Sequence, residues 1–254
     1  MEIFDSHAHY DATAFDDDRD PLLASLPDGG VVGVINCADC LDSAARSKVL
    51  CERYPFLYMA AGVHPEQAAT VDTDRLEEQL LPYLQYGKTV AVGEIGLDYY
   101  WEDACPRDKQ RAVFETQLQI AQKFDLPVIV HDREAHADTL TLLRKYRPRG
   151  VVHCFSGSVE TMREIVDLGM YIGLGGVVTF KNARVPVEVA AAVPLDRLLS
   201  ETDAPYMAPV PFRGKRCDST LIPYAAEKIA QLRGMDTEEV LSITAQNARR
   251  LFGI

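Results

Sequence analysis

The sequence predicts an α/β protein that folds as a single (β/α)8 barrel of the TIM type. Two observations support this fold class. Eight short runs rich in β-branched residues alternate with helical stretches along the chain, and this alternation is typical of a parallel sheet whose strands are joined by helices. The length of 254 residues also suits a closed barrel of this kind. We therefore expect residues 1–254 to form one domain.

The predicted strands are short and apolar. They span 3–9, 31–36, 57–62, 89–94, 127–131, 150–154, 170–174 and 198–202. An open doubly wound sheet is the alternative fold, but such a sheet is expected to carry a glycine-rich phosphate-binding turn after its first strand. Here the first strand ends in His7-Ala8-His9 instead, which favours the barrel.

The predicted helices lie between these strands. They span 41–53, 72–86, 107–124, 134–147, 159–168, 186–193, 220–232 and 236–249. The clearest is 107–124, where Val113, Phe114 and Leu118 recur near a 3.6-residue period. The longest stretch without periodicity is 203–219, and it follows the last strand. We expect this loop at the face where barrel enzymes place their chemistry.

The chain is acidic, with a net charge of −12 at pH 7. This charge argues against broad electrostatic binding to a nucleic-acid backbone, although metal ions and a few cations can still hold a nucleic-acid substrate locally. No run approaches the roughly 20 apolar residues of a transmembrane helix. The start, Met1-Glu-Ile-Phe-Asp5, lacks the basic and apolar segments of a signal peptide. We expect a cytoplasmic protein with no membrane partner, and we favour a monomer.

The six cysteines are expected to be reduced, as in other intracellular enzymes. Cys37-Ala-Asp-Cys40 is the one CxxC motif, and we interpret it as two thiols in a loop rather than a redox or zinc site. Nucleophilic catalysis is poorly supported, because no GxSxG motif occurs. Cys154 is expected to point away from its neighbour His153, and the turn at Ser156-Gly157 offers backbone amides to an oxyanion.

Metal-ligand side chains begin at the first predicted strand. Alternate residues of a strand share a face, so Asp5, His7 and His9 should point into the barrel together. Two imidazoles at this spacing can hold one ion, and Asp5 can orient one of them as a hydrogen-bond acceptor.

Four further candidate metal ligands lie at or just after the ends of other predicted strands. Glu94 ends the fourth, and its two oxygens can bridge two ions. His131 and His153 lie at the ends of the fifth and sixth predicted strands, which are neighbours, so the two histidines can hold a second ion. Asp203 follows the eighth strand, which adjoins the first in a closed barrel, so it can reach the ion at His7 and His9. Together these residues predict two divalent ions.

Other polar residues are expected around the same mouth. His64, in Gly62-Val-His-Pro65, is expected to touch substrate or to support a ligand, whereas His136 is expected on the surface. The basic residues Arg213, Lys215 and Arg216 are expected to bind substrate phosphate.

Together these segments resemble the TatD family of metal-dependent hydrolases, within the amidohydrolase-like metal-dependent barrels. The matching segments occur in order over nearly the whole chain, and as a set they are far more specific than HxH alone. They are Asp5-Ser-His-Ala-His9, Gly62-Val-His-Pro65, Gly93-Glu-Ile-Gly-Leu-Asp-Tyr-Tyr100, Pro127-Val-Ile-Val-His131, His153-Cys-Phe-Ser-Gly157, Glu201-Thr-Asp-Ala-Pro-Tyr206, Ala208-Pro-Val-Pro-Phe-Arg-Gly-Lys-Arg216 and the terminal Asn247…Arg250-Leu-Phe252.

The resemblance implies a divalent-metal hydrolase of TatD-type deoxyribonuclease character, with 3′-to-5′ exonuclease activity on DNA or RNA. Carried over by position, one ion would be held by His7, His9, Glu94 and Asp203. The other would be held by His131, His153 and the bridging Glu94. Histidine and carboxylate ligands suit magnesium, manganese, zinc or cobalt. One departure affects substrate preference, because Cys217-Asp-Ser219 stands where the family usually has Asn-Glu-Pro.

The expected chemistry is metal-assisted hydrolysis of a phosphodiester. Asp203 is the candidate general base, Glu94 holds both ions, and His64 is expected to contact the phosphate. A metal-dependent amide or ester hydrolase, such as a D-aminoacyl-tRNA deacylase, is an alternative that uses the same ligands. A third hypothesis is a non-catalytic protein that binds metal or a partner. The intact set of metal ligands argues against this hypothesis.

Overall fold

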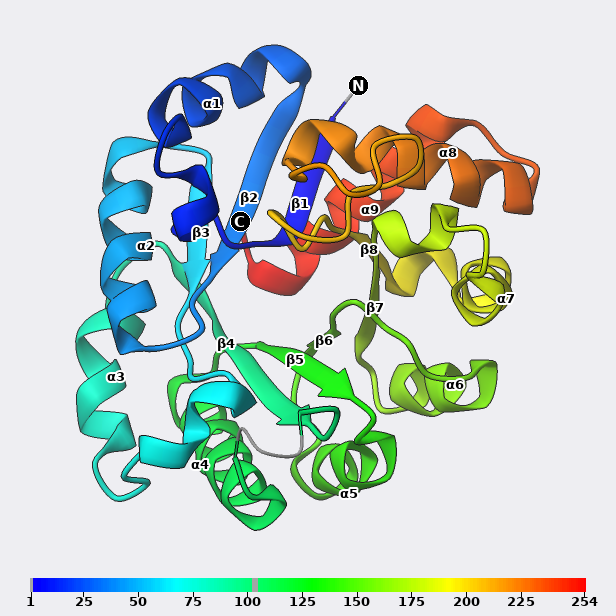
Figure 1. Ribbon diagram of the computed structural model, residues 1–254. Coiled ribbons are helices and arrows are strands. Elements are labelled where there is room, and N and C mark those ends of the chain that lie inside the picture. Colours follow the sequence, from blue (N-terminus) through cyan, green and yellow to red (C-terminus); the bar gives the residue numbers. More distant parts are fainter. Residues whose placement is uncertain (1, 102–104) are drawn as a thin grey trace.

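The computed structural model describes residues 2–101 and 105–254, and it confirms the predicted (β/α)8 barrel (Figure 1). Eight parallel strands follow one another around the sheet in the order of the sequence. The strands are β1 (Ile3–Ala8), β2 (Val31–Cys37), β3 (Leu57–Ala60), β4 (Thr89–Asp98), β5 (Val128–Arg133), β6 (Gly150–Val152), β7 (Tyr171–Leu174) and β8 (Leu198–Ser200).

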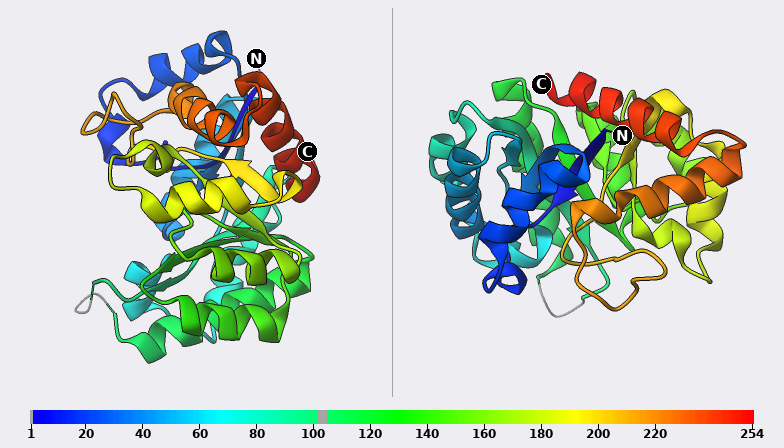
Figure 2. Two further views of the ribbon diagram at one scale, coloured as in Figure 1. Left: turned by 90° about the vertical axis from the view of Figure 1, so that its right-hand side faces the viewer. Right: turned by 90° about the horizontal axis from the view of Figure 1, so that it is seen from above.

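The helices surround the strands, as Figures 1 and 2 show. They are α1 (Arg19–Ser25), α2 (Leu41–Arg53), α3 (Leu76–Leu84), α4 (Arg107–Phe124), α5 (His136–Tyr146), α6 (Val159–Asp167), α7 (Arg184–Ala192), α8 (Ile222–Arg233) and α9 (Thr237–Phe252). Short 3₁₀ helices occur at Thr13–Phe15, Leu26–Gly29, Pro65–Thr70, Gly176–Thr179, Leu195–Arg197 and Ser219–Leu221. The bounds of α2 and α4 match the prediction. Helix α1 was not predicted, because seven residues are too few to show a helical period. Within the described part of the chain, none of the helices has the length and apolar character needed to cross a membrane.

The two ends of the barrel differ in what fills them. At one end, a buried cluster draws side chains from all eight strands and from α9. The contributions of α9 are Ala245, Ala248, Leu251 and Phe252. Figure 2 shows α9 (red) on the side of the barrel opposite the loop 203–219 (orange). Helix α9 therefore closes one end with apolar side chains and leaves the opposite end, where the strands finish, for polar groups.

The first and last strands meet at that polar end. Ala8 and Ala204 form a parallel bridge, and the backbone amide of His9 donates to the Ala204 carbonyl at 2.7 Å. The Asp203 amide donates to the His7 carbonyl at 2.9 Å. The start and the end of the sheet are thus joined at the residues predicted to bind metal.

Strand β4 is longer than predicted, and Glu94 does not end it. Ile95, Gly96 and Asp98 continue to pair with β5, with Gly96 opposite His131. The pairing of β4 with β5 shifts register between Val92 and Ile95. The prediction stopped at Glu94 because a buried carboxylate is atypical within an apolar run, whereas here Glu94 lies inside the strand and is 3% exposed.

Gly96 permits β4 and β5 to approach closely beside His131. Its φ is +146°, and a Cβ at this position would lie 2.0 Å from the His131 carbonyl oxygen. We expect Gly96→Ala to lower the free energy of unfolding by about 1–3 kcal/mol, as overpacked sites typically do. Gly87→Ala is the matched control, because no heavy atom lies within 4 Å of its Cβ. Urea unfolding measures both, and equal midpoints would show that β5 can shift freely.

Candidate metal centre

A cavity of about 920 Å³ opens where the strands end. Five of the six predicted ligands line it, namely His9, Glu94, His131, His153 and Asp203. The sixth, His7, is fully buried against this group. The structure therefore brings all six predicted metal ligands together.

Four ligand atoms converge on one side of Glu94. The Nε2 atoms of His7 and His9 are 3.0 Å apart. Glu94 Oε2 lies 3.3 Å from the first and 3.4 Å from the second. Asp203 Oδ1 lies 3.5 and 3.4 Å from the same two nitrogens. These atoms surround a single point, as the ligands of one ion do.

A second group lies on the other side of the same carboxylate. Glu94 Oε1 is 3.0 Å from His131 Nδ1 and 2.6 Å from His153 Nε2. The two imidazole nitrogens are 3.3 Å apart. Each oxygen of Glu94 thus faces its own pair of histidines, which is the arrangement that a carboxylate bridging two ions requires.

Two of the imidazoles are oriented by acceptors on their far nitrogen. His9 Nδ1 donates to the Cys37 carbonyl at 2.8 Å, which turns Nε2 toward Asp203 and Glu94. His131 Nε2 lies 3.0 Å from Asp98 Oδ2, so its Nδ1 faces Glu94. Asp98 was not among the predicted site residues. Asp98 could have been predicted from its position, because it follows Glu94 by four residues and therefore lies on the same face of β4.

Asp5 does not orient an imidazole as predicted. Its Oδ1 accepts from the backbone amides of His7 and Thr202, at 3.2 and 3.0 Å. Its Oδ2 accepts from the Thr202 and Ser219 hydroxyls, at 2.6 and 2.7 Å. Side chains two apart on a strand are separated by about 6.5 Å, so Asp5 lies one layer below the His7 ring. It fixes the backbone that carries His7 and ties β1 to the segment after β8.

The atypical segment Cys217-Asp-Ser219 serves the same network. The Ser219 hydroxyl bonds Asp5 and lies 2.7 Å from the Tyr10 hydroxyl, and Cys217 is buried. Asp218 accepts from the Thr220 amide at 2.9 Å. These three residues therefore anchor the loop, and none of them lines the cavity.

The charges of the cluster balance one another. Burial would raise the pKa of Glu94, but His153 and His7 hold that pKa well below its usual range. Burial opposes protonation of His9 and His131, but Asp203 and Glu94 beside the first, and Asp98 and Glu94 beside the second, raise each pKa to about 10. Without metal, protons on these imidazoles supply positive charge beside the buried carboxylates.

The donor set fits divalent ions. The Nδ1 atom of His7 has no hydrogen-bond partner within the described chain, and its Nε2 faces two carboxylate oxygens and a second imidazole. Three overlapping groups drawn from these residues and His64 have ligand atoms within 4.8 Å of one another. None of these groups contains a cysteine. Cys154 was expected to point away from the site, but it borders the cavity. Strand β6 ends at Val152, so the alternation of side chains along a strand does not apply to Cys154.

His64 faces the second ligand group as a hydrogen-bond donor. Its Nδ1 accepts from the Glu66 amide at 3.2 Å, which places the ring proton on Nε2, 3.7 Å from Glu94 Oε1. Burial lowers the pKa of His64 to about 3, so the ring is neutral. A neutral N–H at the cavity wall can donate to a substrate oxygen, and the substrate contact expected for His64 stays a prediction.

The three basic residues of the 203–219 loop lie elsewhere. Arg216 forms two contacts of 2.6 Å with Asp18, and the Arg213 guanidinium carbon is 4.2 Å from the Phe180 ring centre. Neither these residues nor Lys215 lines the cavity. Arg46, Arg133 and His136 do line it. His136, expected on the surface, lies 2.6 Å from Asp132 at the cavity wall.

Glu201 is a further buried carboxylate that sequence reasoning left without a role. Its Oε1 accepts from the Cys154 amide, next to His153. Burial raises the pKa of Glu201 to about 8. Gly173 leaves the space for it, since a Cβ there would lie 2.2 Å from Glu201 Oε2. Its position two residues before Asp203 was the available signal.

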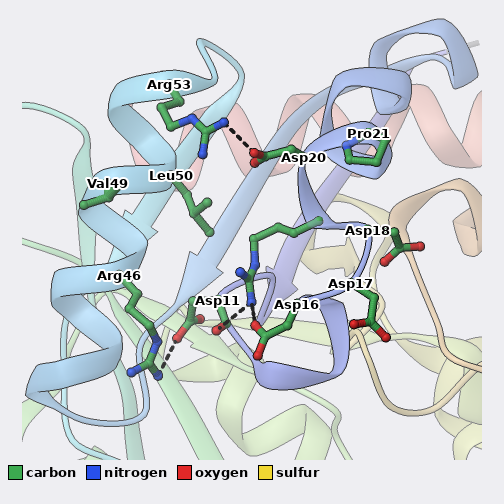
Figure 3. A pocket seen from close by; sticks show the side chains of 11 residues that line it. Asp11, Asp16, Asp17, Asp18, Asp20, Pro21, Arg46, Val49, Leu50 and Arg53 are labelled. Carbon is green, nitrogen blue, oxygen red and sulfur yellow. Dashed lines mark hydrogen bonds and ion pairs between the residues drawn. The ribbon is translucent and has the colours of Figure 1, made fainter.

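A second cavity, of about 460 Å³, lies beside α1 and α2 (Figure 3). Its three arginines are each paired with a carboxylate, in the pairs Arg19–Asp16, Arg46–Asp11 and Arg53–Asp20. The pairing neutralises the arginines, so this cavity offers no unpaired cation to a phosphate.

Comparison with known proteins points to one family. The family model described as TatD related DNase matches residues 4–253. The uncharacterized metal-dependent hydrolase YabD of Bacillus subtilis is 40% identical, over 99% of both chains. The 3′-5′ ssDNA/RNA exonuclease TatD of Salmonella typhimurium is 33% identical, over 99% of both chains. The crystal structure of the TatD homologue YJJV from Escherichia coli superposes with a TM-score of 0.92 at 34% identity, covering 99% of this chain and 98% of that one.

The geometry predicts that Glu94 is required by both ions and His131 by one. We expect Glu94→Ala to reduce bound metal from two ions to nearly none, and His131→Ala to leave one. His136→Ala, which alters the cavity wall outside the ligand set, should retain both. Elemental analysis of dialysed, metal-loaded protein measures the ratio. Full metal content in Glu94→Ala would remove the bridging role.

Metal binding should also release protons. Because the pKa values of His9 and His131 are raised to about 10, both rings are protonated at neutral pH and must lose a proton to bind an ion. Affinity should therefore rise with pH, by about tenfold per pH unit for each proton released. Calorimetric titration in two buffers of different ionisation enthalpy counts the protons. A buffer-independent heat would contradict the prediction.

Proposed function

Because the chain belongs to the TatD related DNase family of metal-dependent hydrolases, we propose that it is a divalent-metal-dependent phosphodiesterase that removes nucleotides from the 3′ end of single-stranded DNA or RNA. The single observation that carries this proposal is the buried Glu94 carboxylate, whose two oxygens each face a separate histidine group. The exonuclease named among the relatives supports the choice of substrate.

The cluster has the composition of a two-ion hydrolytic site. Divalent ions held by the six residues would lower the pKa of water and neutralise the charge of a bound phosphodiester. Magnesium, manganese, zinc and cobalt all accept such ligands.

Asp203 is the proposed general base. Its side chain is 15% exposed, whereas that of Glu94 is 4% exposed, so of the two carboxylates Asp203 is the more open to the cavity. The neighbouring imidazoles outweigh the effect of burial and lower the pKa of Asp203, which keeps the carboxylate ionised and able to take a proton from water.

Substrate contacts are proposed at the cavity wall. The Nε2 proton of His64 faces a phosphate oxygen, and the Arg133 guanidinium lines the same space. Arg46 and His136 also line it, but each is paired with a carboxylate, Asp11 and Asp132 respectively. We place phosphate contacts here rather than at Arg213, Lys215 and Arg216, because Arg216 is paired with Asp18 and none of the three borders the cavity.

The direct test is digestion of single-stranded DNA labelled at either end, by protein loaded with each candidate metal. We expect stepwise loss from the 3′ end that chelation abolishes. Asp203→Asn should lower the rate by about 10²–10⁴-fold, the usual contribution of a general base, while much of the metal stays bound. Wild-type rates in this variant would exclude Asp203 as the base.

Absence of cleavage with every metal would overturn the nuclease assignment. The same ligands can direct water to a carbonyl, so a D-aminoacyl-tRNA would then be the next substrate to test.

A further inference from the structure

Tyr100, Trp101 and Arg133 form a stacked group beside the metal centre, which we call the aromatic rim. Trp101 and Arg133 line the cavity that holds the ligand cluster. Tyr100 is 45% exposed and Trp101 is 50% exposed. Two large aromatic side chains thus remain open to solvent beside a group of charged residues, which marks a surface for binding.

The geometry of the rim combines a cation with aromatic faces. The Arg133 guanidinium carbon lies 3.8 Å from the Tyr100 ring centre and 5.7 Å from that of Trp101. The two rings are 4.8 Å apart and nearly perpendicular, at 86°. Aromatic rings and arginine planes are the groups on which proteins stack unpaired nucleobases.

The rim is tied to the metal centre through one carboxylate. Asp98 Oδ1 accepts from the Tyr100 amide at 2.9 Å, and Asp98 Oδ2 lies 3.0 Å from His131 Nε2. Arg133 follows His131 by two residues on β5, opposite Asp98. The aromatic rim is therefore fixed in position relative to the ligand cluster.

Charge alone offers a polyanion little attraction at this cavity. The chain carries a net charge of −12. Six carboxylates besides Glu94 and Asp203 also line the cavity, at Asp11, Asp39, Glu66, Asp98, Asp132 and Glu134. Stacking gives affinity that does not depend on the phosphates, and it selects bases that are not already stacked in a duplex.

We propose that the aromatic rim stacks the base of the nucleotide that adjoins the scissile phosphodiester. The inference rests on the proposed nuclease function and adds to it a recognition of unpaired bases. Trp101 and Tyr100 hold the base, Arg133 extends the stack, and the phosphate next to that base lies toward Glu94 and His131.

Fluorescence tests this directly, because Trp101 is the only tryptophan in the chain. Magnesium-loaded Asp203→Asn protein is titrated with an oligothymidylate and with an abasic oligomer of the same length. We expect quenching by the oligothymidylate alone. Equal effects of the two oligomers, or no effect of either, would overturn the stacking role.

Kinetics provide an independent test with matched variants. We expect Trp101→Leu to raise KM for the oligothymidylate about tenfold, with Trp101→Phe restoring it, and to leave kcat/KM for the abasic oligomer unchanged. Tyr224→Leu is the control, since Tyr224 is an exposed aromatic residue that does not line the cavity. Equal losses on both substrates would assign Trp101 a structural role and overturn the proposal.

The outcomes separate the two proposals. Base-dependent quenching in a protein that cleaves neither oligomer would preserve the rim and reject the nuclease function. Cleavage without base-dependent quenching would preserve the nuclease function and reject the rim.

Discussion

The buried carboxylate of Glu94 is the group on which the rest of the site depends. An isolated negative charge inside a barrel is strongly destabilising unless positive charge lies beside it. Five imidazoles approach its two oxygens within 2.6–3.7 Å. Because the oxygens point to different sides, positive charge is needed on both. Protons supply it in the metal-free protein, and divalent ions bound at these groups would replace two of them.

The fold holds this charged cluster by dividing the barrel into two ends. Apolar side chains from every strand and from α9 fill one end, where they stabilise the sheet. At the other end, Asp5 joins the backbone at His7 to Thr202 and Ser219, so the first and last strands are connected beneath the ligands. The six clustered side chains therefore stand on a base that is fixed by its own hydrogen bonds, as preorganised sites require.

Much of this architecture could be predicted from the sequence, because alternating apolar runs and strand-end ligands are local signals. The sequence predicted the eight strands, the bounds of α2 and α4, and the clustering of six histidine and carboxylate side chains. The extension of β4 past Glu94 was not, because it depends on pairing with β5. The ion pair of Arg216 with Asp18 joins residues far apart in the chain, so Arg213, Lys215 and Arg216 were predicted at the cavity although none of the three lines it.

Supporting residues were harder to predict than ligands, because their types are common and only the tertiary contact gives them a role. Asp98 and Glu201 are examples, because their contacts with His131 and with the Cys154 amide join residues far apart in the sequence. Asp5 was noticed in the sequence, but its partner was misassigned, since alternation gives the face of a strand and not the depth along it.

The joining of β1 to the segment after β8 has a consequence for the newly made protein. Synthesis proceeds from the N-terminus, so His7 is added long before Asp203, its neighbour in the same ligand group. The residues of the second group, Glu94, His131 and His153, have all been synthesised well before Asp203. A nascent chain that has not yet reached Asp203 therefore lacks part of the first group, so this group can assemble only after β8 has been synthesised.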